Sequence, residues 1–182
     1  MINPKPEAIE ALMESWVASN PQQAADWAGS LPAGTFRDDA LSALMVHWAA
    51  RDPAGAAGWM SRTGVDDGEA ASVLAGSWAA TNPAAAAAWA SSMGNLESRR
   101  LAVSSAVSTW AHTAPQTAAA FAERLPANDR ASAITAVIST WAATAPSEAA
   151  AWLTQVPFEL PSDHALALGA LASACTIQPV YM

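Results

Sequence analysis

The sequence predicts an all-α fold: an α-solenoid with a right-handed superhelix, built of about five tandem helix-turn-helix repeats of about 31 residues each. Two observations predict it. Aromatic residues and a proline recur in one fixed frame along the chain, and the apolar residues before each first aromatic share one helical face. The frame accounts for all nine tryptophans of the 182-residue chain.

Each repeat of the frame holds a first aromatic, a proline five positions later and a second aromatic six positions after the proline. The first aromatics are Trp16, Trp48, Trp78, Trp110 and Trp141. The prolines are Pro21, Pro53, Pro83, Pro115 and Pro146. The second aromatics are Trp27, Trp59, Trp89, Phe121 and Trp152. A decayed sixth copy begins with Ala174 and Pro179 in the first two places.

The segment before each first aromatic predicts a long helix, because its apolar residues recur at helical spacing, as at Leu41, Leu44 and Met45. The long helices are expected near residues 6–19, 36–51, 67–81, 96–113, 129–144 and 162–176. Their candidate start signals are Thr35, Asp66, Asn95, Asn128 and Ser162. These side chains can accept a hydrogen bond from the free N–H groups of a helix start.

Each proline predicts the start of a short helix, since its missing N–H costs nothing at the first helical position. Asn20, Asp52 and Asn82 precede three of these prolines as expected N-caps. Breakers end the short helices soon afterwards, at Pro32, Gly64, Gly94, Pro126 and Pro157. The short helices are therefore expected near residues 21–30, 53–62, 83–92, 115–125 and 146–155.

A single hairpin of this size cannot bury its apolar stripe, so neighbouring hairpins are expected to stack around one continuous core. We therefore expect one repeat domain over residues 1–182. Its units lie near residues 6–31, 36–63, 67–93, 96–125 and 129–156, with a partial unit at 162–182.

A proline followed six positions later by an aromatic in an alanine-rich helix resembles the tetratricopeptide repeat. The matching pairs are Pro21/Trp27, Pro53/Trp59, Pro83/Trp89, Pro115/Phe121 and Pro146/Trp152. The unit is about three residues shorter than the repeat of about 34 residues in that family, and it lacks the Leu-Gly pair and the tyrosine of the family's first helix. The chain also resembles Trp-Ala/Asp-Pro/Ala-Ala-x-Trp arrays of uncharacterised bacterial proteins. The local matches are Trp48-Ala49, Asp52-Pro53, Trp27-Ala28 and Leu31-Pro32. Such arrays imply a scaffold or adaptor.

Composition excludes several classes of function. A formal net charge of −8 argues against nucleic acid as a partner. The chain lacks a run of about 18 apolar residues, so we expect no membrane partner. Pro4, Pro6 and Glu7 interrupt the apolar run that a signal peptide would need, which favours a cytoplasmic location. One cysteine excludes an internal disulfide framework.

The sequence offers no convergent catalytic, metal or cofactor set, and we expect a protein that is not an enzyme. His47, His112 and His164 occupy different phases of the repeat, so they do not form a ligand set. Asp163 and His164 are neighbours on a helix and point to different faces. Cys175 replaces a repeated alanine and is expected to pack rather than react.

The tryptophans have two interpretations: packing in the core, which the repeat frame favours, or an exposed row that stacks sugars or bases. On the first interpretation, Trp78→Ala or Trp89→Ala costs about 3–5 kcal/mol, and the terminal Trp16→Ala costs less.

One surface survives as a candidate binding site, because the solvent side of the short helices carries small, mostly uncharged residues. Its members are Gly55, Gly58, Ala84, Ala88, Ser92, Ala120 and Ala151. Small residues there either let short helices pack closely or form a shallow groove for an extended peptide or a partner helix. The sequence thus predicts an interaction scaffold that binds a protein or peptide. The alternative is an accessory domain of a larger enzyme, or a small-molecule or carbohydrate binder that uses a concave tryptophan row.

The two ends of the chain differ. The first helix carries Lys5, Glu7, Glu10 and Glu14 as a polar cap, whereas the last segment is apolar. Its apolar residues are Leu166, Leu168, Leu171, Ile177, Val180 and Tyr181. We expect this C-terminal face to be covered by more of a longer protein, by the tail after Pro179, or by a second copy in a two-fold dimer.

Overall fold

The computed structural model describes residues 6–156, 158 and 161–176. Within these residues it has eleven helices, which make up 83% of them, and no strand. The all-α class is therefore confirmed.

Long and short helices alternate along the chain. The long helices are α1 (Pro6–Ser19), α3 (Thr35–Ala49), α5 (Gly68–Ala79), α7 (Leu96–Thr113), α9 (Ala127–Thr144) and α11 (Pro161–Thr176). The short helices are α2 (Pro21–Ser30), α4 (Pro53–Thr63), α6 (Pro83–Ser91), α8 (Pro115–Glu123) and α10 (Pro146–Leu153). Every bound lies within about two residues of the expected one, because prolines and local caps set most of the helix starts.

The proline junctions form as expected. Side chains of Asn20, Asp52 and Asn82 accept hydrogen bonds from the backbone N–H three residues later, over 2.9–3.2 Å. At the last two junctions alanine stands in the N-cap place and gives no side-chain bond. Proline is first in the helix at all five short helices.

The starts of the long helices differ from those expected. Asn95 caps α7 as expected, but α3 starts after Gly34 and α9 after Pro126. Helix α5 is capped by Asp67, whose Oδ1 accepts from the N–H of Ala70 at 2.8 Å, and not by Asp66. The expected caps at Thr35, Asp66 and Asn128 are therefore wrong, and Ser162 lies inside α11.

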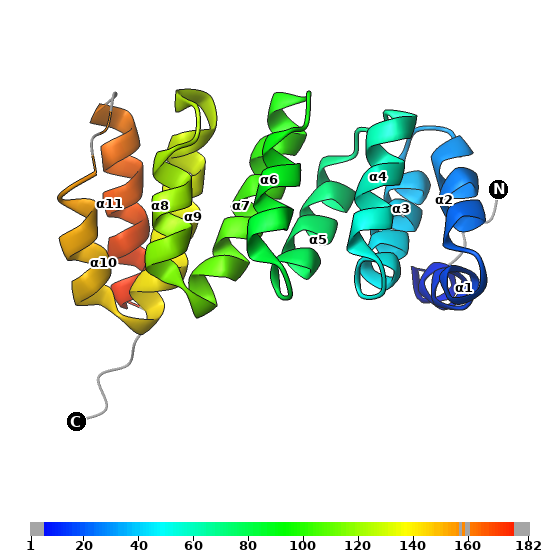
Figure 1. Cartoon of the computed structure of the whole chain (residues 1–182), viewed down its shortest axis with the longest axis horizontal. Helices are drawn as coiled ribbons and strands as arrows, with labels where there is room; N and C mark the ends of the chain where they lie inside the picture. The colour runs from blue at the N-terminus through cyan, green and yellow to red at the C-terminus, as the bar shows by residue number, and fades with distance from the viewer. Residues whose placement is uncertain (1–5, 157, 159–160, 177–182) are drawn as a thin grey trace.

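The helices are arranged in two layers. Each long helix packs on the long helices before and after it, and each short helix packs on the long helix that precedes it and the one that follows it. Figure 1 shows the hairpins side by side along the long axis of the molecule, with α1 and α11 at opposite ends.

The aromatic residues of the frame meet in pairs inside this stack. Each first aromatic packs on the second aromatic of its own hairpin, with ring centroids 5.6–6.4 Å apart and ring planes tilted by 39–49°. Trp48, Trp59, Trp110 and Trp141 are buried, and the other five tryptophans are half-buried. The rings thus fill space that the many alanines of the core leave open.

Candidate functional site

The residues expected to form a binding face lie on four consecutive short helices, α4, α6, α8 and α10, or at their ends. Ala84, Ala88, Ser92, Ala120 and Ala151 are exposed. Gly55 and Gly58 are half-buried. Four of the seven occupy one equivalent position, directly before the second aromatic: Gly58, Ala88, Ala120 and Ala151. The frame therefore repeats on the surface of the short-helix layer as well as in the core.

Where α2 faces α4, the second aromatic closes the space between the two helices. Trp59 is 1% exposed, and its Nε1–H donates to Oδ1 of Asp26 at 2.9 Å. A Cβ atom at Gly29 would lie 3.2 Å from the indole, so the ring fills this space tightly. We call this contact the closed junction.

Where α8 faces α10, the indole again donates to a carboxylate of the preceding short helix, although this ring is only half-buried. Nε1–H of Trp152 donates to Oε1 of Glu123 at 2.7 Å. Asp26 stands one residue before the second aromatic of its hairpin, and Glu123 stands two residues after its own. Both positions let a short helix reach the indole of the next hairpin.

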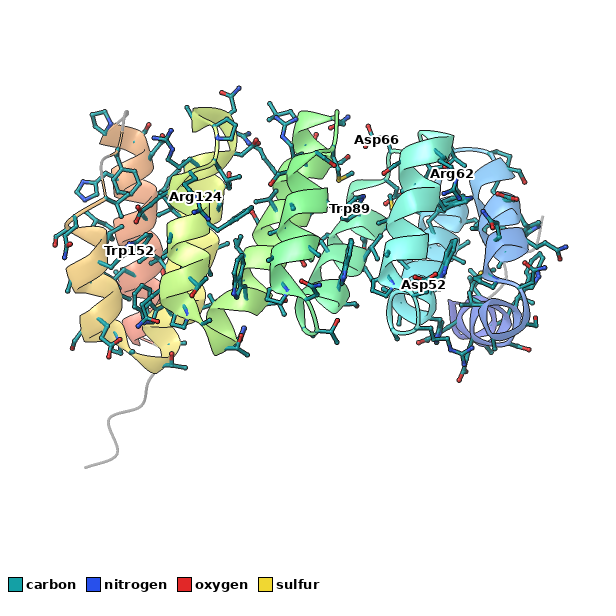
Figure 2. The ribbon with its side chains drawn as sticks, viewed as in Figure 1. Asp52, Arg62, Asp66, Trp89, Arg124 and Trp152 are labelled. Carbon is teal, nitrogen blue, oxygen red and sulfur yellow. The ribbon has the colours of Figure 1, made fainter. Side chains whose placement is uncertain are left out.

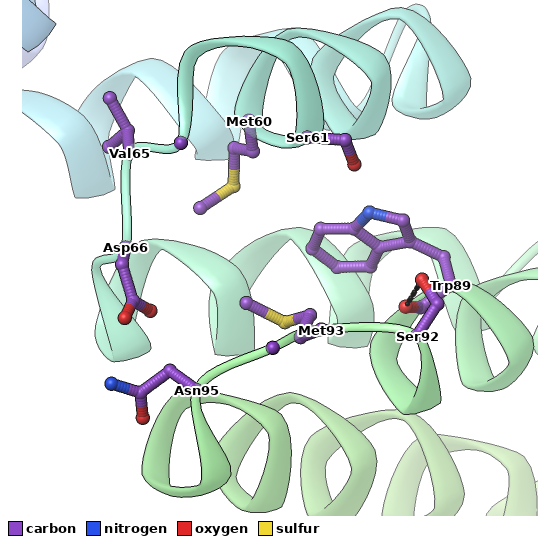
Figure 3. Close-up of a pocket in the computed structure, with 10 residues that line it drawn as sticks. Met60, Ser61, Val65, Asp66, Trp89, Ser92, Met93 and Asn95 are labelled. Carbon is purple, nitrogen blue, oxygen red and sulfur yellow. Dashed lines mark hydrogen bonds between the residues drawn. The ribbon is translucent and has the colours of Figure 1, made fainter.

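Where α4 faces α6, neither position holds a carboxylate. Gly58 and Ser61 occupy them, and the indole N–H of Trp89 makes no hydrogen bond to any residue that the structure describes. Trp89 is only half-buried, and a pocket of about 330 Å³ opens beside it. We call this contact the open junction and its cavity the junction pocket. Figure 2 shows Trp89 in the gap between α4 and α6, and Figure 3 shows its ring between Met60 and Ser61 on one side and Ser92 and Met93 on the other.

The walls of the junction pocket are apolar near the indole and polar at the two loops. Met60, Met93 and Val65 contribute the apolar surface beside Trp89. Methionine side chains are flexible and polarizable, so such a wall adapts to different apolar groups. The hydroxyls of Ser61 and Ser92 donate within their own helices, to the carbonyl oxygens of Ala57 and Trp89.

Two polar groups at the loop side have capacity for a ligand. The carboxylate of Asp66 is exposed and makes no hydrogen bond or ion pair within the described residues, since Asp67 takes the capping role. Asn95 uses its Oδ1 to accept from the N–H groups of Glu97 and Ser98, at 2.8 and 3.1 Å. Its Nδ2 remains able to donate. The pocket therefore combines an apolar body with a negative rim.

An arginine from α7 fixes one wall of the pocket. Arg99 donates from Nη1 to the carbonyl oxygen of Met93 at 3.0 Å and from Nε to Oδ2 of Asp129 at 2.8 Å. Asp129 is 3% exposed. The loop that carries Met93 and Gly94 is thus tied to α7 and α9, which makes the pocket a pre-formed feature.

The junction pocket was not predicted from the sequence, although the sequence carries two signals of it. Both loops that line it contain a glycine breaker, Gly64 and Gly94, where the other repeats have Pro32, Pro126 and Pro157. The second signal is that residues 58 and 61, which are Gly58 and Ser61, are not acidic. This signal can be interpreted only once the structure shows that Asp26 and Glu123 accept from the indole of the next hairpin.

The histidines do not gather. His47 lies on α3 with its Nε2 buried and unpaired, His112 contacts the carbonyl of Ser108, and His164 packs against Phe158 with ring centroids 5.2 Å apart. In the described part of the chain, no group of three or more His, Cys, Asp or Glu residues could hold a metal ion. The side chain of Cys175 lies outside the described residues.

Helix α11 exposes Leu166 (62%) and Leu168 (46%), as the apolar C-terminal segment leads one to expect. Ile177, Val180 and Tyr181 lie outside the described residues, so a covering tail or a two-fold dimer stays a prediction. Among the described helices, none combines the length and the hydropathy that crossing a bilayer requires.

Comparison of the chain with protein-family models, with curated proteins and with solved structures finds no match.

Proposed function

We propose that this chain is a non-enzymatic interaction scaffold: an α-solenoid of five helical hairpins whose short-helix layer binds an extended peptide segment of a partner protein. The observation that carries the proposal is the row of small residues at one equivalent position of successive short helices. Ala88, Ala120 and Ala151 are exposed there, on a stack whose core is held by paired rings. Stacked hairpins offer long surfaces of this kind, and small side chains let a peptide backbone approach closely.

The alternative of a carbohydrate or small-molecule binder needs a row of exposed indoles. All nine tryptophans lie in the described residues, and none of them is exposed. The ring faces are used by the five aromatic pairs, which favours the peptide scaffold. The tetratricopeptide-like frame supports the same choice.

The test is selection of binding peptides from a random library displayed on phage. Ala88→Glu and Ala120→Glu put bulk and charge on the small-residue row, and Ser139→Glu puts the same side chain at an exposed position of the long helix α9. Selected peptides are expected to bind the unmodified chain and Ser139→Glu equally and to lose about tenfold or more in affinity for the other two variants, a change of about 1.4 kcal/mol. Equal binding to all three variants rejects the short-helix layer as the site.

A further inference from the structure

We infer that the junction pocket is the specificity pocket of this peptide surface, and that its occupant is a large apolar side chain next to a Lys or Arg in an extended peptide. This inference rests on the proposed function. Three features of the pocket carry it: its size and apolar walls, the unpaired indole N–H of Trp89, and the free carboxylate of Asp66.

The size and walls of the pocket suit one apolar side chain. Its volume of about 330 Å³ lies at the lower end of the range of about 300–1,000 Å³ for ligand pockets. Met60, Met93 and the indole of Trp89 surround the apolar part. A leucine, isoleucine, methionine or phenylalanine side chain removes more apolar surface from water there than a polar one, which is the main source of affinity at such a site.

The indole N–H of Trp89 is available to donate a hydrogen bond to the ligand. Its two equivalents that face a preceding short helix, Trp59 and Trp152, each donate to a carboxylate oxygen within 2.9 Å. On α4 the two equivalent positions are Gly58 and Ser61, so no carboxylate stands there to accept from Trp89. An extended peptide presents a carbonyl oxygen at every residue, so its backbone can supply the missing partner.

The charge at the rim selects a basic neighbour. Asp66 is exposed and unpaired among the described side chains, and Asp67 and Glu69 follow it closely. Arg62 is not among the residues that line the pocket. The guanidinium of Arg62 extends back along α4 toward Gly58, since a Cβ atom built on Gly58 would lie 3.2 Å from Nη1 of Arg62. Arg99 is occupied by Asp129 and by the carbonyl of Met93.

The wider charge distribution acts in the same direction. Residues 1–95 contain ten acidic and four basic residues, a net charge of −6 out of −8 for the chain. A basic peptide is therefore attracted to this half of the molecule. An acidic group in the pocket would instead face the carboxylate of Asp66, and the described residues that line the pocket include no Lys or Arg.

The experiment compares peptide selection on four proteins: the unmodified chain, Ser61→Glu, Ser91→Glu and Asp66→Lys. Ser61→Glu places a carboxylate at the position that Glu123 holds in the α8–α10 contact, so the chain itself supplies the acceptor and occupies the pocket. Ser91→Glu is the matched control. It adds the same side chain at the equivalent position of α6, where the facing aromatic is Phe121, which has no N–H to donate.

On the unmodified chain, selection should yield peptides with a large apolar residue beside Lys or Arg. These peptides should bind Ser91→Glu as before and lose about tenfold or more in affinity for Ser61→Glu, while Asp66→Lys should select an acidic residue in place of the basic one. The Nε1–H NMR signal of Trp89, identified by its loss in Trp89→Phe, should shift on addition of the selected peptide.

The outcomes separate the two proposals. Selected peptides that lack the apolar–basic pair, or that bind Ser61→Glu as tightly as the unmodified chain, overturn the pocket inference; if Ala120→Glu still abolishes their binding, the proposed function stands. A library that yields no binder overturns both. A melting temperature of Ser61→Glu equal to or above that of the unmodified chain excludes unfolding as the cause of a lost interaction.

Discussion

The closed and open junctions are built from the same frame, yet one is filled and the other holds a cavity. At the closed junction Asp26 of α2 accepts from Trp59 of α4, and the ring is 1% exposed. At the open junction α4 presents Gly58 and Ser61 to Trp89 of α6, and the ring is half-buried beside about 330 Å³ of free volume. The frame therefore fixes where a ring stands, and the two junctions differ in whether the preceding short helix offers the indole an acceptor and in how far the ring is buried.

The largest expected difference between the junctions is in stability. Trp59→Ala should lower the free energy of unfolding by about 3–5 kcal/mol, because it empties a fully buried site. Trp89→Ala should cost about 2–3 kcal/mol, since part of its ring already faces the pocket and water. Denaturation in urea, followed by circular dichroism, measures both.

The half-buried position of Trp89 lowers the cost of about 3–5 kcal/mol that the sequence alone predicts for Trp89→Ala. Trp89→Phe serves as a control that keeps the ring contact with Trp78 and removes the N–H. A cost for Trp89→Ala equal to that for Trp59→Ala would mean that the open junction is as well packed as the closed one.

Removing the arginine that holds the pocket wall should have the next largest effect. Arg99→Ala leaves Asp129, which is 3% exposed, without its cation and should destabilise the fold by about 3 kcal/mol. The double variant Arg99→Ala/Asp129→Ala should recover part of this loss, because no buried charge is then left unpaired. A double variant that is less stable by the full sum of both single costs would contradict this role of the pair.

The helices were predictable from the sequence because their signals are local. Pro21, Pro53 and Pro83 start helices through their own geometry, and the periodicity of apolar residues needs no partner to be recognised. The pocket was not predictable in this way. It depends on which side chain of one hairpin meets an indole about 30 residues later, and on whether Asp66 or its neighbour Asp67 caps α5.

A glycine in one pocket loop should be more sensitive than a glycine in the other. Gly64 has φ = +67°, a left-handed conformation that ends α4, so Gly64→Ala should cost about 1–2 kcal/mol. Gly94 has no positive φ, and a Cβ atom there would meet nothing within 4 Å, so Gly94→Ala should leave the melting temperature unchanged or raise it slightly. Equal losses at both positions would show that the pocket loops depend on flexibility rather than on the αL cap.

The smallest expected effect on stability is that of Ser61→Glu, the substitution that gives the open junction the kind of acceptor found at the closed one. Ser61→Glu supplies Trp89 with the acceptor that Glu123 gives Trp152. It should stabilise the fold by about 0.5–1 kcal/mol, which is less than a buried hydrogen bond to a charged group contributes, because Ser61 is exposed. Asp26→Ala makes the converse change at the closed junction and should cost about 1 kcal/mol. Ser91→Glu should gain nothing, because Phe121 cannot donate. Equal shifts of the urea midpoint for Ser61→Glu and Ser91→Glu would mean that any gain comes from charge or helix propensity and not from a hydrogen bond to the indole. The missing acceptor would then not explain the open pocket.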